Sequence, residues 1–370
     1  MTVSSIYVDQ DVADSAIAQR ICLRIGIEPS ILTDEQVLFD SIAKADDPAG
    51  FGKSILYLTR NKGQFIRPCP GTKRYRCCGL QILHTGTYCT MDCAYCILQC
   101  YFHPPVLSHF VNYGDLFDAL DDLFSGPGIS RVCTGEFTDS LIWEQYTDQV
   151  PQLIDAFAGQ SRAVLELKTK TVNIGRLLSL SHNRKAILAW SLNTDRAIAR
   201  EERGATSLAA RIEAAAAAAA AGFPLAFHFD PILIYPGCEE EYRSVVRRVF
   251  SRIPGDQVIW ISLGTFRYMP ALKPIIAHRF PSSKIPYGEF IQGLDGKMRY
   301  FKPLRVAIYE RVAAWIREAA PDVLLYFCME DDEVWEKSIG LTPGDQGGLP
   351  RLLDERAARF CGLDGHLTAA

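Results

Sequence analysis

Along the middle of the chain, short runs of apolar residues alternate with segments whose apolar residues recur at helical spacing. Short apolar runs, typical of fully buried strands, lie at 80–84, 129–133, 163–167, 186–192, 225–229 and 258–263. Apolar residues at helical spacing fall between them, at 116–124, 150–157, 211–221 and 241–253. This alternation predicts a parallel sheet of six strands, and the run at 323–328 predicts an added strand.

Local signals fix several further elements. The chain begins with the apolar stretch Ile6-Tyr7-Val8, and a helix is expected from about Asp11. The alanine run 214–221 is rich in the best helix former, and Gly222 ends it as a helix C-cap residue would. Asp295-Gly296 predicts a hairpin turn between 289–291 and 298–300.

Composition narrows the class of protein. The chain has 370 residues, 12 cysteines and a formal net charge of -4. One main domain is expected at this length. The cysteines are too sparse for a disulfide scaffold, and the N-terminus has no basic segment followed by an apolar core, so a reducing cytoplasm is expected. The sequence has no run of about 18 apolar residues, so no membrane-spanning helix is expected. The net charge argues against indiscriminate polyanion binding, so charge has to be read locally.

Three cysteines gather in one short stretch. Cys89, Cys93 and Cys96 stand in a C-x3-C-x2-C spacing, which lets a loop turn three sulfurs inward. Soft thiolates select iron-sulfur clusters, zinc or Cu(I), and three ligands leave one metal corner open to a small chelating molecule. The residues alone leave two alternatives, buried thiols that cluster or a zinc knuckle, although zinc sites usually add a fourth Cys or His.

Three further cysteines lie within about 20 residues before this loop. Cys69 lies in a rigid Pro-Cys-Pro-Gly turn, and Cys77-Cys78 follow closely. A second metal site here lacks a ligand set, so these residues are expected to be buried or redox-inert thiols.

Polar residues follow the predicted strands. In parallel barrels the active-site residues lie at the C-terminal ends of the strands, so these side chains are expected to share one region. They are Thr134, Gly135, Glu136, Thr138, Lys168, Lys170, Ser191, Asn193 and Asp230.

The segment from Arg267 to Arg305 is basic. It has eight Lys or Arg against two acids, interleaved with five aromatic residues. Basic and aromatic side chains together suit phosphate contact and base stacking. A solvated charged face is the alternative.

Together these motifs resemble the spore photoproduct lyase family, radical S-adenosylmethionine (SAM) enzymes that repair a thymine photodimer in DNA. The three-cysteine loop with Tyr95 before its last cysteine is the radical SAM signature. The likeness runs from about residue 80 to 340 and includes WSLN at 190–193, RIEAA at 211–215, AGFPL at 221–225, PI at 231–232 and MRY at 298–300. The resemblance implies an α/β fold, a partial (β/α)6 TIM-type radical SAM barrel with an N-terminal extension and a C-terminal β-hairpin and helical segment.

The resemblance also implies roles for individual residues. Cys89, Cys93 and Cys96 would ligate a 4Fe-4S cluster, whose fourth iron binds SAM; reductive cleavage then gives a 5'-deoxyadenosyl radical that abstracts a hydrogen atom from the substrate. The residues expected to bind SAM are Thr138, Lys170, Ser191, Asn193 and Asp230. The residues expected on the lesion side of the hairpin are Lys297, Arg299 and Tyr300.

Three positions depart from the family pattern. Glu136 stands where the lyases carry the cysteine that returns a hydrogen atom to the product radical, Ile97 replaces a tyrosine, and Asp230 replaces a small apolar residue. The O–H of a protonated carboxyl group is a poor hydrogen-atom donor. The catalytic candidates are therefore Cys133 as donor, Glu136 as a ligand for SAM or substrate, and Tyr95.

The sequence thus predicts a radical SAM lyase that repairs a thymine-type DNA lesion. The protein is expected to be a cytoplasmic monomer that does not bind a membrane. An electron donor such as flavodoxin or ferredoxin is expected as its partner. Two alternatives stay open: a radical SAM enzyme acting on a non-DNA anionic substrate, and a non-enzymatic iron-sulfur or zinc protein that binds nucleic acid. The expected organisation is an N-terminal extension at 1–79, the barrel at 80–266 and a C-terminal segment with the basic hairpin at 267–370.

Overall fold

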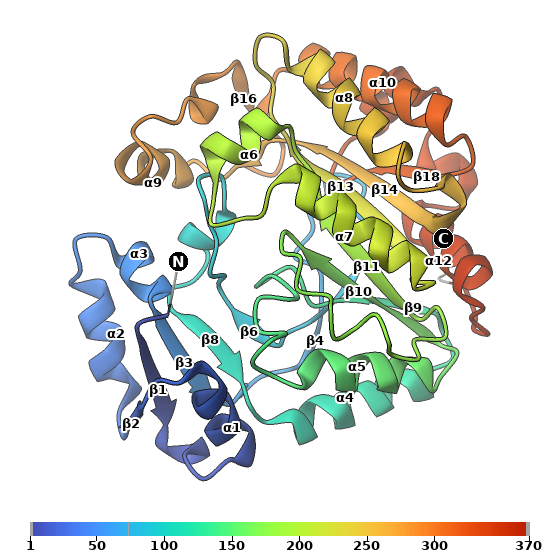
Figure 1. Cartoon of the computed structure of the whole chain (residues 1–370). Coiled ribbons are helices and arrows are strands. Elements are labelled where there is room, and N and C mark those ends of the chain that lie inside the picture. Colours follow the sequence, from blue (N-terminus) through green and yellow to red (C-terminus); the bar gives the residue numbers. More distant parts are fainter. Residues whose placement is uncertain (1–2, 73, 368–370) are drawn as a thin grey trace.

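The centre of the protein is a curled sheet of eight strands (Figure 1). The computed structural model describes residues 3–72 and 74–367. The strands, in spatial order, are β18 (Leu324–Phe327), β14 (Val258–Thr265), β13 (Leu225–Ile232), β11 (Ala186–Ser191), β10 (Ala163–Thr169), β9 (Ser130–Cys133), β5 (Gln81–Leu83) and β4 (Ile66–Pro68). Every neighbouring pair is parallel except β4 with β5. The six predicted strands, the added strand and the partial barrel are confirmed.

The central strands are apolar because both faces of the sheet are covered. All residues of β9, β11 and β14 are buried. Helices follow the outside of the curled sheet, with α7 over β11 and β13 (Figure 1). The helices of the barrel are α4 (Tyr113–Ser125), α5 (Gln149–Ala158), α6 (Asp195–Glu201), α7 (Leu208–Ala220), α8 (Cys238–Phe250) and α10 (Lys302–Ala319). The helices at the C-terminal end are α11 (Asp332–Ile339) and α12 (Leu349–Cys361).

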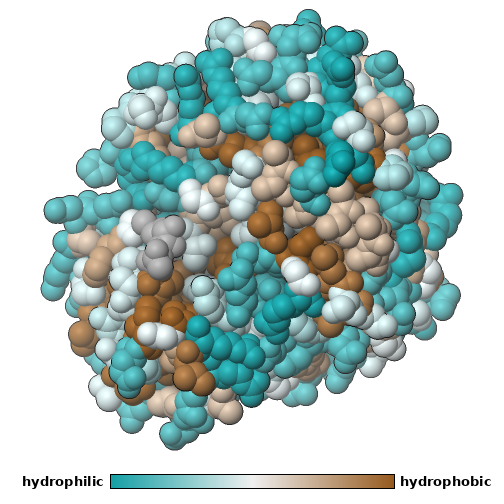
Figure 2. All heavy atoms as spheres, in the orientation of Figure 1, coloured by the Kyte–Doolittle hydropathy of each residue, from teal (hydrophilic) through white to brown (hydrophobic). Residues whose placement is uncertain are grey.

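Helix α7 contains the alanine run. Ser207 caps its N-terminus by accepting the Ala210 N–H, and Gly222, with a φ of 86°, follows its C-terminus as predicted. Ala215 and Ala218 are fully buried, so the small side chains let α7 lie close to the sheet. The surface over α7 is apolar in Figure 2 because it is made of alanine.

Helix α8 differs from its prediction. The helix expected around 241–253 begins at Cys238 and ends at Phe250. Gly237 has a left-handed φ of 83°, which turns the chain into the helix three residues early. At its other end the helix stops at Phe250, so the predicted extension to Ile253 is wrong.

The N-terminal segment builds a second, smaller α/β unit. Its sheet has the order β2 (Pro29–Leu32), β1 (Ser5–Asp9), β3 (Ile55–Thr59), β8 (Leu107–Phe110) and β6 (Gly86–Thr87). Its helices are α1 (Ala16–Ile25), α2 (Glu35–Ala43) and α3 (Pro48–Lys53). The helix expected from about Asp11 starts later, because residues 10–12 form a 3-10 turn and Ser15 caps α1. The domain limits 1–79, 80–266 and 267–370 stay predictions.

The C-terminal segment carries the predicted hairpin. β16 (Phe290–Gln292) and β17 (Met298–Tyr300) pair antiparallel around Asp295-Gly296, and β15 (Arg267–Tyr268) pairs with the other edge of β17. Helix α9 (Leu272–Arg279) lies beside it (Figure 1). In the described part of the chain no helix is both long and apolar enough to cross a membrane.

Candidate active site

The three-cysteine loop begins directly after β6. Tyr88 turns the chain with a left-handed φ of 68°, and its side chain is fully buried. Residues 92–93 then form the short strand β7 (Asp92–Cys93), which pairs antiparallel with β12 (Glu202–Arg203). The loop is thus attached to the chain that follows α6, at the C-terminal side of the barrel strands.

Side chains from distant parts of the sequence hold the loop backbone. Lys53, at the end of α3, is 1% exposed, and its ammonium donates to the carbonyls of Cys89 (2.9 Å) and Met91. Gln99 donates to the carbonyls of Cys93 (3.3 Å) and Cys96 (3.2 Å). These carbonyls are satisfied by side chains, so the loop keeps its shape without regular secondary structure.

Arg279 from α9 completes this frame. Its guanidinium lies 3.0 Å from Asp92 and 2.8 Å from Asp47, and it also donates to the amide oxygen of Gln99. The N-terminal unit and the C-terminal segment therefore both contact the loop. Neither Lys53 nor Arg279 was predicted as part of the site, because nothing in the local sequence marks a partner so far along the chain.

The cysteine side chains suit a cluster that binds thiolates. Burial raises the pKa of Cys89 to about 12 and also raises the pKa of Cys93. Charge on Cys96 raises the pKa of both thiols further, so the three sulfur groups act on one another. A cationic iron cluster would offset this cost, because a metal-bound thiol is deprotonated.

No group of three Cys, His, Asp or Glu among the described residues is arranged to hold a single metal ion. A 4Fe-4S cluster has a different requirement, because each ligand sulfur binds a separate iron atom. The loop, its buried thiols and its satisfied backbone fit such a cluster.

Tyr95 lies in a buried charged network. Its hydroxyl donates to Glu202, and Arg211 bonds the other oxygen of Glu202 at 2.5 Å. Arg211 is fully buried and also donates to the Ser191 carbonyl at 2.9 Å. Burial and the Glu202 charge raise the pKa of Tyr95, so it keeps its proton. The Lys170 ammonium lies 5.8 Å from the centre of the Tyr95 ring, which brings one predicted SAM-binding residue to the loop.

The other predicted SAM-binding residues lie at neighbouring strand ends. Thr138 is 8% exposed, and its hydroxyl has no partner among the described residues. Such an orphaned buried hydroxyl can bond a ligand. The Asn193 amide is used within the protein, since it accepts from Tyr242 at 2.8 Å and donates to the Pro231 carbonyl at 3.0 Å.

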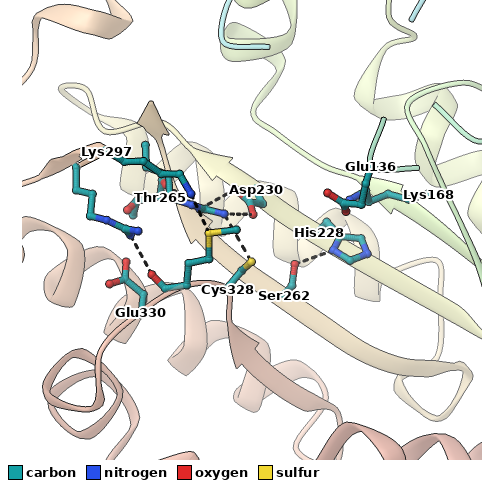
Figure 3. Close-up of polar contacts among 12 residues, drawn as sticks. Glu136, Lys168, His228, Asp230, Ser262, Thr265, Lys297, Cys328 and Glu330 are labelled. Atoms are coloured by element: carbon teal, nitrogen blue, oxygen red, sulfur yellow. Dashed lines mark hydrogen bonds and ion pairs between the residues drawn. The ribbon is translucent and has the colours of Figure 1, made fainter. Parts of the chain in front are cut away.

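Asp230 is paired rather than free. Both of its oxygens accept from the Arg267 guanidinium, at 3.2 and 3.1 Å. Figure 3 shows Asp230 together with Glu136, which follows β9, and Lys168, which lies on the neighbouring strand β10. Glu136 and Lys168 form a second ion pair. The charges at Glu136 and Asp230 are therefore each matched by a cation.

A buried polar layer lies below these pairs. His228 bonds the Ser262 hydroxyl through Nδ1 (2.7 Å) and lies 3.1 Å from Glu166 through Nε2. Trp260 donates to the other Glu166 oxygen at 2.8 Å. All four side chains are buried, so they form the floor of the site.

Cys133 and the group of Cys69, Cys77 and Cys78 lie outside the three-cysteine loop. Cys133 is fully buried, and its sulfur accepts the Gly135 N–H at 3.2 Å. The Cys77 sulfur lies between the thiols of Cys69 and Cys78, whose hydrogen bonds lower the pKa of Cys77. Residue 76 forms a backbone bridge with residue 330, which brings this thiol group beside the end of β18.

The predicted lesion-side residues are largely buried. Arg299 is 1% exposed and pairs with Asp295 at 2.7 Å. Tyr300 is 2% exposed, and its hydroxyl accepts the Ile234 N–H at 3.2 Å. Lys297 lies 3.5 Å from Asp295. These residues shape the hairpin from inside.

The basic segment is therefore mostly an internal ion-pair network. Its paired cations are Arg267, Arg279, Lys297, Arg299, Lys302 and Arg305. Lys273 and Lys284 are exposed and form no ion pair with a described carboxylate. Their ammonium groups lie 5.1 and 5.9 Å from the ring of the exposed Tyr287.

A separate cavity lies away from this site. It has a volume of about 500 Å³ and is lined by residues that include Asp11, Lys62 and Asp115, between the N-terminal sheet and α4. None of its lining residues belongs to the strand-end site.

Comparison with known proteins bears on this arrangement. The family model of spore photoproduct lyase matches residues 80–305. Spore photoproduct lyase of Bacillus subtilis is 30% identical over 253 residues, which cover 65% of this chain and 74% of that protein. The Clostridium acetobutylicum enzyme is 25% identical over 254 residues, covering 68% and 71%.

Solved structures share the fold. A spore photoproduct lyase complexed with dinucleoside spore photoproduct superposes with a TM-score of 0.76 at 19% identity, over 87% of this chain and 98% of that one. A mutant form with bound SAM and dinucleoside spore photoproduct gives a TM-score of 0.75 at 19% identity, with the same coverage. At this level of identity the structures establish the shared fold.

Proposed function

Because the chain belongs to the spore photoproduct lyase family, we propose that this protein is a radical SAM enzyme that repairs a thymine-type photolesion in DNA. The family cofactors are a 4Fe-4S cluster and SAM. When bound, they supply a 5'-deoxyadenosyl radical that abstracts a hydrogen atom from the substrate. The residues of this chain position these groups and exclude water.

One observation carries the proposal. The loop with Cys89, Cys93 and Cys96 is fixed at the same side of the barrel as the strand-end polar residues, and Lys170 reaches the Tyr95 ring. We assign the three cysteines to the cluster. We assign SAM binding to Thr138, Lys170, Ser191, Asn193 and Asp230, with the Thr138 hydroxyl the clearest free group.

Tyr95 and Glu136 have separate roles in this proposal. Tyr95 keeps its proton and is anchored by Glu202, so it forms a fixed wall beside the cluster loop. Glu136 is held by Lys168 and presents a carboxylate at the strand ends, where it can accept a hydrogen bond from the amino end of SAM or a substrate N–H. Both are assigned as contacts to SAM or substrate.

The proposed substrate is a lesion within DNA, so the protein has to bind DNA. Lys273 and Lys284 flank an exposed tyrosine, and such cationic and aromatic side chains contact phosphates and bases. Lys297, Arg299 and Tyr300 are assigned to the lesion side, where Arg299 and Tyr300 act by fixing the hairpin. An electron donor such as flavodoxin or ferredoxin, a monomeric state and a reducing cytoplasm complete the proposed setting.

Anaerobic reconstitution with iron and sulfide tests the proposal. We expect an EPR signal of the reduced cluster that changes when SAM is added, and 5'-deoxyadenosine on reduction. A panel of UV-damaged oligonucleotides then identifies the lesion. A cluster that ignores SAM would favour a non-enzymatic nucleic-acid-binding protein, and SAM cleavage without conversion of any lesion would favour another anionic substrate.

A further inference from the structure

Cys328 carries a thiol that has no assigned role in the proposed reaction. It directly follows β18, and its backbone N–H donates to the Leu263 carbonyl of β14 at 3.1 Å. Its side chain is partly exposed, unlike that of Cys133. The strand therefore delivers this thiol to the C-terminal end of the sheet, where the polar site residues lie.

The thiol contacts the charged pair of the site. The Arg267 guanidinium lies 3.6 Å from the Cys328 sulfur while it binds both oxygens of Asp230. Figure 3 shows Cys328 on the same side of the sheet as Asp230, with Glu136 farther along the strand ends, after β9. Burial raises the pKa of Cys328 to about 11, and the Asp230 and Glu136 charges add to the effect against Arg267. Cys328 consequently keeps its S–H hydrogen at neutral pH.

The next residue joins the thiol to the lesion side. Arg299 donates to the Met329 carbonyl at 2.9 Å, and the Lys297 ammonium lies 3.5 Å from the Met329 sulfur. Met329 has a left-handed φ of 55°, so the chain turns sharply at this point. Cys328 thus lies between Asp230, assigned to SAM, and β17, assigned to the lesion.

Cys133 has a less open position. Its side chain is fully buried, and its sulfur accepts the Gly135 N–H at 3.2 Å. Gly135 in turn leaves no room on that side, since an added Cβ would lie 2.8 Å from the Lys168 carbonyl oxygen. A substrate would have to displace this packed turn to reach the Cys133 sulfur.

We propose that Cys328 returns the hydrogen atom to the product radical in the repair reaction, a role that rests on the proposed function. Loss of a hydrogen atom from the lesion and cleavage of the bond between the bases leave a carbon-centred radical. The Cys328 S–H bond breaks homolytically, a C–H bond forms on that carbon, and a thiyl radical remains on Cys328. A one-electron reductant of the class that reduces the cluster, with a proton from solvent, restores the thiol.

Repair of dinucleoside spore photoproduct in deuterated buffer tests this role, because a thiol exchanges its hydrogen with solvent. The wild-type protein should place deuterium on the repaired thymidine. Cys328→Ala and Cys328→Ser should still release 5'-deoxyadenosine but lose deuterated thymidine in favour of radical adducts. Serine keeps a polar contact to Arg267, so retention of normal product by the serine variant would show a structural role and overturn the proposal. Cys22→Ala, which removes a buried thiol from α1, is the matched control and should behave as the wild type.

Failure of the donor role and failure of the proposed function give different results. If the wild type repairs the lesion and both Cys328 variants give the same deuterated product, the donor role falls and the proposed function stands. Loss of product in Cys133→Ala alone would assign the role to Cys133 and overturn the inference. If the wild type cleaves SAM but leaves the lesion intact, the proposed function fails, and the donor role fails with it.

Discussion

Replacing Lys53 with methionine should loosen the three-cysteine loop. The ammonium of Lys53 is 1% exposed and donates to two loop carbonyls, those of Cys89 and Met91. Methionine fills most of the space but cannot donate a hydrogen bond. Two buried carbonyls would then be left unsatisfied, at about 1–2 kcal/mol each, so the loss is about 2–4 kcal/mol. The nearby Asp92 keeps Arg279 as a partner, so no buried charge is left alone.

Two measurements check this prediction. The Tm of the protein should fall by about 4–8 °C, taking ~2 °C per kcal/mol. Amide hydrogen exchange at residues 89–96 should rise more than exchange in β11 or β14, because the damage is local. Lys62→Met is the matched control, since Lys62 is exposed and pairs only with Glu35 among the described residues. If Lys53→Met keeps wild-type Tm and loop protection, Lys53 does not hold the loop.

Three further predictions follow from the structure. The double variant Lys273→Ala with Lys284→Ala should flatten the salt dependence of DNA binding by about two counterions, and an unchanged slope would exclude this surface from phosphate contact. Gly52→Ala should lower the free energy of unfolding by about 1–3 kcal/mol in denaturant titration, because its Cβ would lie 1.8 Å from the Pro105 carbonyl oxygen; a wild-type midpoint would refute the clash. Burial lowers the pKa of His109 to about 4, so the unfolded chain takes up this proton first on acidification. The stability that depends on neutral His109 is present above about pH 6.5 and falls progressively toward pH 4, and His109→Gln should reduce that slope by up to about one proton in pH-dependent unfolding.

Local signals in the sequence predicted much of this structure. The strands from β5 to β14 are short runs in which nearly every residue is buried, so their apolar character alone marks them. The hairpin follows from one Asp295-Gly296 pair, and α7 follows from alanine and its flanking cap. The family could be recognised because its motifs are short and contiguous.

The contacts around the loop could not be predicted in the same way. Lys53 acts on Cys89 from 36 residues away, and Arg279 acts on Asp92 from 187 residues away. The basic segment misled for a related reason: Arg299 resembles a free cation in the sequence, but the hairpin folds it against Asp295. Charge counts along a chain do not reveal which cations the fold has already paired.

Repair of dinucleoside spore photoproduct by the anaerobically reconstituted protein tests the proposed function most directly. With SAM and a reductant, we expect conversion of the lesion to thymidine together with 5'-deoxyadenosine. Both products should disappear when Cys93, the proposed cluster ligand within β7, is replaced by alanine. Formation of 5'-deoxyadenosine without any thymidine, or thymidine formed equally by Cys93→Ala, would contradict the proposed function.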